Sequence, residues 1–207
     1  MLSRLYPILD TTLASRQGLN PIYVAEEWLA AGVGILQFRH KGFFSREIFG
    51  HMERIAALCR QARVPFVVND RADLAAILDA ALHLGQEDLL PSAARSVTGP
   101  GAIIGLSTHN EAQLRAALAE PADYLALGPM FSTASKENPD PTVGLDELRR
   151  LRPILDRPLV AIGGITRANA REVLAAGADS VAVIGDLFPE DCDLRGRAKE
   201  WLRVVSD

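Results

Sequence analysis

Short apolar runs alternate along the whole chain with segments whose apolar residues recur every three or four positions. The short runs are rich in Val, Ile and Leu, which is typical of parallel strands buried on both faces. Each run ends in a polar or glycine-containing turn. Eight runs are expected to be strands: residues 4–10, 34–41, 65–70, 81–85, 102–107, 123–130, 158–164 and 180–187.

The segments between these strands have mostly helical periodicity, with the weakest pattern at residues 91–97. Helices are expected over residues 21–32, 45–62, 71–81, 91–97, 110–120, 145–155, 166–178 and 193–205. Eight alternating units predict the α/β class and a closed (β/α)8 TIM barrel. An open doubly wound sheet is the alternative, but it usually has fewer strands, and no G-x-G-x-x-G motif follows the first strand.

Composition indicates one barrel domain spanning residues 1–207. The 207 residues are 48% hydrophobic and 23% charged, which suits a globular protein with a substantial core. No linker divides the chain. The stretch richest in Pro, Gly and Asn, residues 135–144, is too short to separate two domains and is expected to be a long functional loop.

Charge and cysteine content narrow the function further. The net charge is −4 without a basic tract, which argues against nucleic acid as a partner. The first residues lack the apolar core of a signal peptide, and no run approaches about 20 apolar residues, so we expect no membrane segment and a cytoplasmic location. Cys59 and Cys192 lack the spacing of metal ligands and are expected to be reduced thiols.

In a barrel of this kind the chemistry lies at the carboxyl ends of the strands. Polar residues unusual for a strand occur at or just after five predicted strand ends: Gln37, Arg39, Lys41, Asn69, Asp70, Asp88, Ser107, His109, Thr133, Ser135 and Lys136. His109 is left open between a general base and a helix cap or packing residue.

The last two strand ends carry glycines. Gly163 and Gly164 end the seventh predicted strand within AIGGIT, and Ile184 with Gly185 ends the eighth. These are the positions where such barrels often bind phosphate, and glycine lets the backbone approach an anion closely. The alternative is a tight turn without a ligand, in which Thr166 caps the next helix.

Two acids and three cations suggest a second anionic group. Asp70 and Asp88 follow neighbouring strands and are expected to share one Mg²⁺, although a single Asp at a strand end is often a cap or turn residue. Arg39, Lys41 and Lys136 would add positive charge at the same end of the barrel. Together these residues indicate a metal-bound diphosphate and a separate monophosphate as ligands.

The order and spacing of several motifs resemble the thiamine-phosphate synthase family over nearly the full chain. They are QFRHK, where the family usually reads Q-[LFY]-R-[ED]-K, and LGPMFSTASK, where the family reads GP-[IVM]-F-P-T-x-T-K, with VVND, LHLGQEDL, GLSTHN, VGL, AIGGI and AGADSVAVIG. The resemblance implies a transferase of thiamine biosynthesis that joins 4-amino-2-methyl-5-hydroxymethylpyrimidine diphosphate to a thiazole (carboxylate) phosphate and releases pyrophosphate.

The resemblance also implies the role of each site residue. The pyrimidine diphosphate would be held by Gln37, Arg39, Lys41, Asn69, Ser107 and Lys136, of which Lys136, Arg39 and Ser107 would be catalytic. The thiazole phosphate would be held by Thr133, Ala134, Ser135, Gly164, Ile184 and Gly185. One Mg²⁺ would be held by Asp70 and Asp88. The implied mechanism is a dissociative displacement that needs no protein nucleophile.

The chain departs from the family pattern at six positions within or beside these motifs: His40, Ser132, Ala134, Ser135, Gly185 and Asp186. Ser135 keeps a hydroxyl and Gly185 keeps a backbone N–H, so the expected phosphate contacts can survive. Alternative functions on the same scaffold are a thiazole tautomerase, which needs no diphosphate site, and a non-catalytic binder of thiazole phosphate. The sequence leaves the oligomeric state open, a homo-oligomer included.

Overall fold

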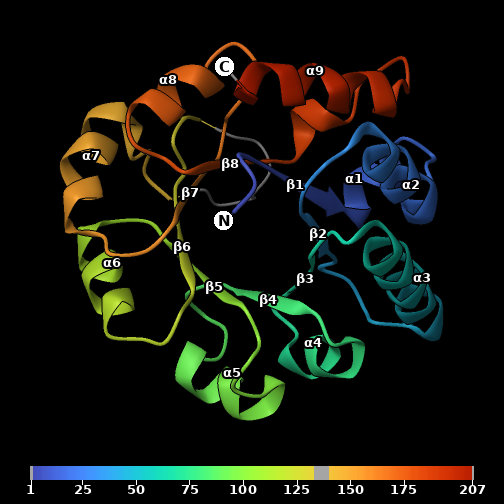
Figure 1. The fold of residues 1–207 in the computed structure, drawn as a ribbon, viewed down its shortest axis with the longest axis horizontal. Helices are drawn as coiled ribbons and strands as arrows, with labels where there is room; N and C mark the ends of the chain where they lie inside the picture. Colours follow the sequence, from blue (N-terminus) through green and yellow to red (C-terminus); the bar gives the residue numbers. More distant parts are fainter. Residues whose placement is uncertain (1, 133–139, 207) are drawn as a thin grey trace.

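A computed structural model, which describes residues 2–132 and 140–206, forms a closed barrel of eight parallel strands. Each strand pairs with the next along the chain, and β8 returns to pair with β1, so the ring has no open edge (Figure 1). The strands are β1 Leu5–Asp10, β2 Leu36–Arg39, β3 Phe66–Asn69, β4 Ala81–Leu84, β5 Ile104–Thr108, β6 Tyr124–Leu127, β7 Leu159–Ile162 and β8 Ser180–Val183. The predicted (β/α)8 barrel is confirmed.

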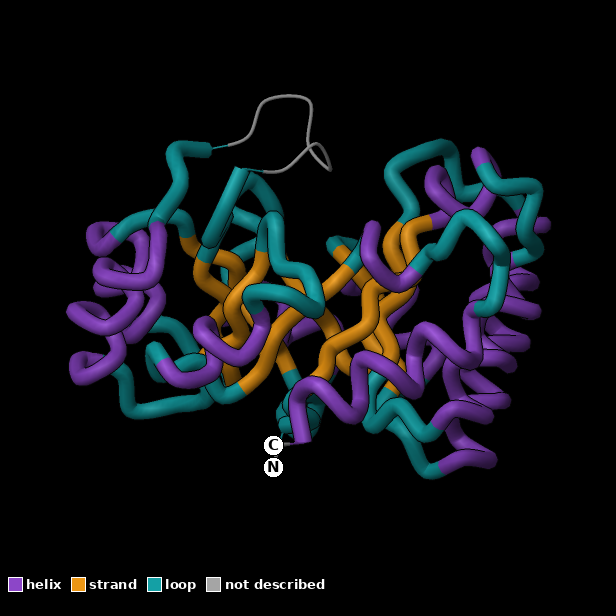
Figure 2. The backbone as a smooth tube through the Cα atoms, turned by 90° about the horizontal axis from the view of Figure 1, so that it is seen from above, coloured by secondary structure: helices purple, strands orange, loops and turns teal. Residues whose placement is uncertain are grey.

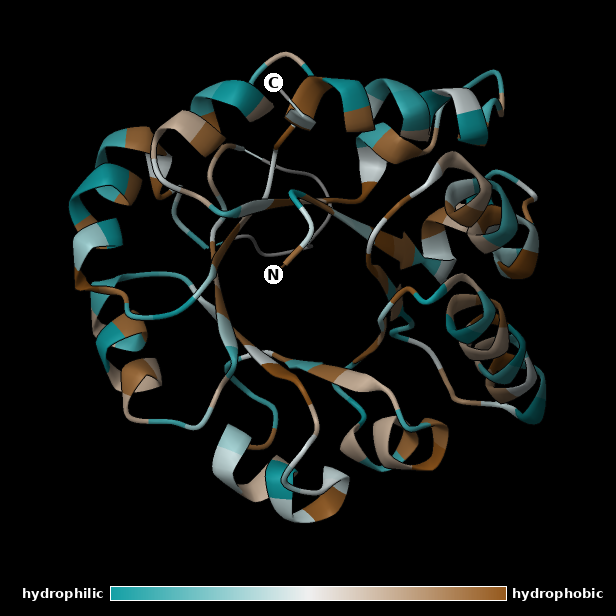
Figure 3. Ribbon diagram, viewed as in Figure 1, coloured by the Kyte–Doolittle hydropathy of each residue, from teal (hydrophilic) through white to brown (hydrophobic). Residues whose placement is uncertain are grey.

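Helices surround the barrel and turn their apolar faces towards it (Figure 3). They are α1 Thr11–Arg16, α2 Pro21–Ala31, α3 Arg46–Ala62, α4 Ala72–Leu78, α5 Pro91–Thr98, α6 Glu111–Leu118, α7 Gly144–Leu151, α8 Ala170–Ala175 and α9 Leu194–Ser206, with short 3-10 helices η1 Arg152–Ile154 and η2 Gly185–Leu187. The sequence pattern did not predict α1. This helix has only six residues and begins directly after β1, where the Asp10 side chain accepts a hydrogen bond from Leu13 N.

Alternation along each strand creates two cores. Outward residues such as Leu9 and Leu36 pack against the helices, whereas inward residues such as Tyr6 and Tyr124 fill the barrel. Gly105 makes room for the aromatic ring of Tyr124, because a Cβ atom at this glycine would lie 2.1 Å from Tyr124 Cζ. The inward layer therefore carries two tyrosine hydroxyl groups into the barrel interior.

The two ends of the chain meet on the face where the strands begin (Figure 2). Arg4 Nη1 donates a hydrogen bond to Val205 O at 2.9 Å. Helix α9 packs against α2, and both Trp28 and Trp201 are fully buried. Within the described ranges, no helix has the length and apolar character that a membrane crossing requires.

Candidate active site

A cavity of about 790 Å³ opens at the carboxyl ends of the strands. The structure brings most of the sequence-predicted site residues to its wall: Gln37, Arg39, Lys41, Asn69, Asp70, Asp88, Ser107, His109, Gly164, Ile184 and Gly185. The other four predicted residues, Thr133, Ala134, Ser135 and Lys136, lie outside the residues that the structure describes. The position of the cavity agrees with the general rule for (β/α)8 barrels.

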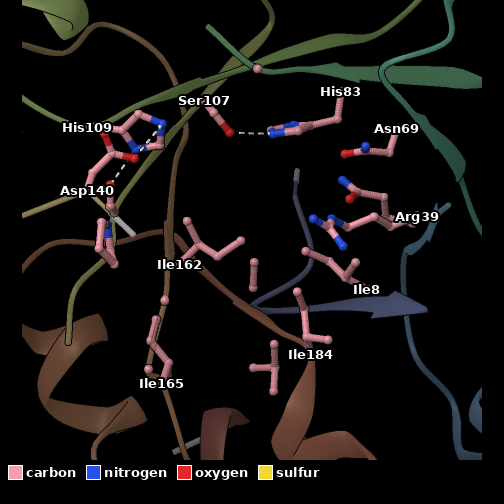
Figure 4. A pocket seen from close by; sticks show the side chains of 18 of the residues that line it. Ile8, Arg39, Asn69, His83, Ser107, His109, Asp140, Ile162, Ile165 and Ile184 are labelled. Carbon is pink, nitrogen blue, oxygen red and sulfur yellow. Dashed lines mark hydrogen bonds and ion pairs between the residues drawn. The ribbon is translucent and has the colours of Figure 1, made fainter. Parts of the chain in front are cut away.

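Strand alternation explains why these side chains reach the cavity. Gln37 and Arg39 occupy inward positions of β2, Asn69 occupies one on β3, and Ser107 one on β5. Figure 4 shows Arg39 and Asn69 close together on one side of the cavity. Asn69 Nδ2 is buried and has no hydrogen-bond partner within the described part of the chain. This amide therefore keeps a donor that none of the described residues uses.

Asp70 has an unusual backbone conformation just after β3. Its φ angle is +67°, in the left-handed region that non-glycine residues rarely adopt. Asp70 N donates to His83 O at 2.8 Å, which fixes the backbone, and Lys41 Nζ lies 2.5 Å from Asp70 Oδ2. Backbone strain of this kind is common at functional sites. The local structure therefore directs the Asp70 carboxylate towards the Lys41 ammonium group, just after β2.

Asp88 lies opposite this group in the loop after β4. Its Oδ2 atom accepts a hydrogen bond from Gly85 N at 2.7 Å. Burial raises the pKa of Asp88, the Gly85 N–H partly offsets this, and the neighbouring Asp70 carboxyl raises the pKa further. Two carboxylates that disfavour each other's charge are stabilised by a cation between them.

The donor set fits Mg²⁺. Among the described residues there is no group of three or more His, Cys, Asp or Glu side chains that could hold a metal ion. Mg²⁺ commonly uses only one or two carboxylates and takes its remaining oxygen ligands from water and substrate phosphates. Asp70 and Asp88 meet that requirement.

The turn after β7 is packed tightly against the loop that follows β6. Gly163 and Gly164 have φ angles of +96° and +66°, and a Cβ atom at Gly164 would lie 2.6 Å from Ser132 O. Met130 N donates to Ile162 O at 2.9 Å, and Phe131 N donates to Gly163 O at 3.0 Å. Both glycines are therefore required by conformation and by the close approach of another backbone segment.

The following helix, α8, is not capped by Thr166, the residue that the alternative without a ligand expected. Helix α8 begins after Asn169, not after Thr166. Thr166 N donates to Asn169 Oδ1 at 2.8 Å, and Asn169 Nδ2 donates to Gly164 O at 3.1 Å. The glycine turn is thus held by Asn169, which lies five residues downstream of Gly164.

The end of β8 completes this part of the cavity. Ile184 and Gly185 line it, and nothing lies within 4 Å of the position a Gly185 Cβ atom would occupy. The adjacent Asp186 brings an acid to the cavity wall, but Arg167 Nε lies 3.0 Å from its Oδ2 atom. The ion pair offsets the negative charge beside the expected phosphate position.

A chain of buried polar groups beneath the cavity was not predicted. Gln37 Nε2 donates to the Tyr6 hydroxyl at 3.0 Å, and this hydroxyl lies 2.7 Å from that of Tyr124. His83 Nδ1 lies 2.9 Å from the Tyr124 hydroxyl, and His83 Nε2 lies 2.9 Å from Ser107 Oγ (Figure 4). The network thereby joins two of the predicted site residues, Gln37 and Ser107.

Burial determines the protonation state of this network. It lowers the pKa of His83 to about 4, so the imidazole is neutral near pH 7. Burial also raises the pKa of both tyrosines, which keeps their hydroxyl groups protonated. The one sequence signal for His83 is its inward position within the apolar strand ALHL.

Two other histidines, His109 and His40, have different surroundings. His109 Nδ1 lies 2.6 Å from Gly128 O, and His109 Nε2 lies 3.5 Å from Asp140 Oδ2 (Figure 4). Asn110 caps α6, so His109 is not a helix cap. His40 Nδ1 contacts Thr11 Oγ1 at 2.7 Å, and its side chain is not among the groups that line the cavity.

Neither cysteine is among the residues that line the cavity. Cys59 is buried in α3, and burial raises the pKa of its thiol to about 12. Cys192 is exposed in the loop before α9. A buried protonated thiol is a poor nucleophile, so Cys59 is poorly suited to attack a substrate.

A closed barrel whose polar side chains gather at the carboxyl ends of its strands, beside a glycine turn, belongs to the class of (β/α)8 barrel enzymes that handle phosphorylated substrates. Comparison with known proteins makes the assignment more specific. Residues 5–187 match the model of a family described as thiamine monophosphate synthase. The chain therefore belongs to the thiamine monophosphate synthase family.

Individual relatives resemble this chain over nearly its whole length. A thiamine-phosphate synthase of Koribacter versatilis (strain Ellin345) is 48% identical, over 99% of this chain and 96% of its own. One from Chloroflexus aurantiacus is 37% identical, over 98% of this chain and 93% of its own. The solved structure of a thiamine phosphate pyrophosphorylase from Pyrococcus furiosus, 33% identical, superposes with a TM-score of 0.86 and covers 98% of this chain and 95% of its own.

Proposed function

We propose that this cavity joins the methylene carbon of hydroxymethylpyrimidine diphosphate to the ring nitrogen of a thiazole phosphate, giving thiamine phosphate and pyrophosphate. Membership of the family and full-length similarity to thiamine-phosphate synthases support this transferase activity. The observation that carries the residue-level proposal is the facing pair Asp70 and Asp88, with Lys41 against one of the two carboxylates.

The diphosphate is assigned to the β2 and β3 side of the cavity. Arg39 and Lys41 supply positive charge, and Asn69 supplies the amide donor for which the described residues offer no partner. Gln37 and Ser107 are oriented by the buried tyrosine and histidine network and present polar groups to the pyrimidine part of the substrate. Lys136 is assigned to the same substrate from the family pattern.

Mg²⁺ bound by Asp70 and Asp88 would neutralise charge on the leaving diphosphate as a Lewis acid. The bond that breaks joins the methylene carbon to a diphosphate oxygen, and its electron pair leaves with the diphosphate. The thiazole nitrogen then forms the new bond with its lone pair. The protein's contribution is to stabilise the leaving group with Arg39 and Lys41 and to position the two reactants.

The thiazole phosphate is assigned to the opposite side of the cavity, where Gly164, Ile184 and Gly185 expose backbone. Thr133, Ala134 and Ser135 are assigned to the same phosphate by the family pattern. The charged substrates and the free cysteines fit a cytoplasmic enzyme.

Pyrophosphate release from the two substrates, measured with Mg²⁺, tests this proposal through Asp70→Asn. Asparagine tolerates the left-handed backbone at this position but lacks the negative charge. We expect release to require both substrates and to fall by about 100-fold or more in the variant, because a metal ion supplies several kcal/mol of transition-state stabilisation.

Asp79→Asn is the matched control, because Asp79 is also an aspartate with a positive φ angle of +51° and is exposed at the end of α4. It should release pyrophosphate like the wild type. Binding of thiazole phosphate without release by the wild type would contradict the synthase function and favour the tautomerase or the non-catalytic binder.

A further inference from the structure

Asp10 is a buried acid beside the proposed diphosphate site and has no role in the reaction described so far. It ends β1 with 7% of its surface exposed, and it does not belong to the wall of the cavity. Its Oδ1 atom accepts a hydrogen bond from Leu13 N at 3.0 Å, and its Oδ2 atom forms an ion pair with Arg39 Nη1. Both carboxylate oxygens therefore have defined partners.

The barrel itself sets this contact. Asp10 and Arg39 are directly paired across the β1–β2 ladder, and both occupy inward positions at the carboxyl ends of their strands. The hydrogen bond from Leu13 N fixes the carboxylate, so Asp10 is a rigid anchor rather than a mobile surface group. An arginine side chain is long and flexible, and one fixed partner removes much of its freedom.

The negative charge of Asp10 allows two explanations of its role to be separated by the binding of pyrophosphate. A carboxylate near an anionic ligand weakens binding through repulsion. If the acid had no further role, its removal would strengthen the binding of pyrophosphate. If the acid positions Arg39, its removal would weaken the binding, because the guanidinium would lose its orientation towards the ligand. The two explanations predict opposite changes.

We propose that Asp10 is a positioning residue for the transfer reaction: it holds the Arg39 guanidinium in the orientation that contacts the leaving diphosphate. This inference rests on the proposed function, in which Arg39 binds that group. Arg39 Nη1 is occupied by Asp10, and a guanidinium has five N–H donors in a fixed planar arrangement. Within residues 2–132 and 140–206, Asp10 is the one recorded side-chain partner of Arg39, whose remaining donors belong to a group that lines the cavity.

The variant Asp10→Asn tests the inference. Asparagine keeps an oxygen for Leu13 N, so the cap of α1 is preserved, but its amide cannot replace the charged pair with Arg39. We expect inorganic pyrophosphate, titrated by calorimetry in the presence of Mg²⁺, to bind about tenfold more weakly than to the wild type. kcat/KM for the pyrimidine diphosphate should fall similarly, and KM for the thiazole phosphate should stay within twofold.

Asp156→Asn is the control for the loss of one acidic charge. Asp156 is exposed, pairs with Arg157 and lies before β7, on the face away from the cavity. It should bind pyrophosphate like the wild type. In an Arg39→Gln background, the added Asp10→Asn change should alter binding by less than twofold, because Asp10 acts through Arg39.

Pyrophosphate binding that is unchanged or tighter in Asp10→Asn, while Arg39→Gln weakens it, would overturn the inference and leave the proposed function intact. Absence of pyrophosphate release by the wild type would instead overturn the proposed function. If Asp10→Asn does not fold, Asp10→Ser provides the same comparison, because serine also caps a helix and leaves room for water beside Arg39.

Discussion

At the scale of single residues, two cations at or just after the end of β2 are each paired with an acid at or just after the end of a neighbouring strand. Arg39 pairs with Asp10 at the end of β1, and Lys41 pairs with Asp70 just after β3. The two pairs differ in consequence, because Asp70 is also the proposed metal ligand. Under the proposed function, Lys41 and Mg²⁺ would therefore compete for the same carboxylate in the free protein.

Replacement of Lys41 by Gln should separate these effects. The free protein should bind Mg²⁺ about fivefold more tightly, since a largely exposed ion pair contributes up to ~1 kcal/mol. Inorganic pyrophosphate with Mg²⁺ should bind more weakly, because a cation has been removed. Calorimetric titration of each ligand measures both changes, with Lys199→Gln on the exposed side of α9 as the control. Unchanged Mg²⁺ affinity would show that the ammonium group does not compete.

Gly164 offers a test of the phosphate turn. Gly164→Ala should raise KM for the thiazole phosphate by about tenfold or more, because the new methyl group would contact Ser132 O and displace the turn. Gly18→Ala is matched, since both φ angles are +66° and nothing lies within 4 Å of a Cβ atom at Gly18. It should cost about 1–2 kcal/mol in stability and leave KM unchanged. Equal KM values in steady-state kinetics of the two variants would contradict a role for the turn.

At the scale of elements, the alternation of each strand determines both the core and the site. All eight strands were predictable from their apolar runs, but the observed strands are shorter, as with Leu36–Arg39 against residues 34–41. Strand pairing ends where the chain turns into the loops, while the apolar pattern continues. Helix α1 escaped prediction because a six-residue segment has almost no periodicity.

Part of the candidate site could also be predicted from the positions of residues along the strands. Residue type and position after a strand identify Arg39 and Asp70, because all parallel strands end on the same face. Sequence analysis does not identify His83, because no partner lies at ligand spacing in the sequence. Its partners Ser107 and Tyr124 are 24 and 41 positions away, and only barrel closure brings them together. The same applies to Asp10 and Arg39, which are 29 positions apart.

The buried network that joins β4, β5 and β6 should make the barrel sensitive to acid. The pKa of His83 is about 4 in the folded protein, below its ordinary value of 6.5. Between these values the unfolded chain binds a proton that the folded barrel does not, so the free energy of unfolding falls as the pH falls from about 6.5 to about 4. The contribution of one histidine is at most ~1.4 kcal/mol per pH unit.

His83→Gln should remove this contribution. Urea unfolding at pH 7 and pH 5 measures the free energy at each pH, and the variant should lose less stability than the wild type between them. The variant should also be less stable at pH 7, because the hydrogen bonds to Ser107 and Tyr124 are disturbed. An identical loss in both proteins would show that His83 is not the group that titrates.

At the scale of the whole molecule, α9 covers the joint between the first and last units of the barrel. Trp201→Ala should lower the free energy of unfolding by about 3–5 kcal/mol, because this large side chain of α9 is fully buried. Urea unfolding measures the loss. Tyr23→Ala provides the comparison, since Tyr23 lies on α2 with 46% of its surface exposed, and it should cost much less. Similar costs would mean that the joint does not depend on α9.

The hydrogen bond between Arg4 and Val205 has a consequence for the order of the units. Because the first strand and the last helix meet on the face opposite the cavity, a short peptide could join them without crossing the site. A new opening could then be made in the exposed turn around Gly99 and Gly101, between α5 and β5. Such a circular permutant should keep the same order of eight strands around the ring, so β1 is one of several strands with which this barrel can start.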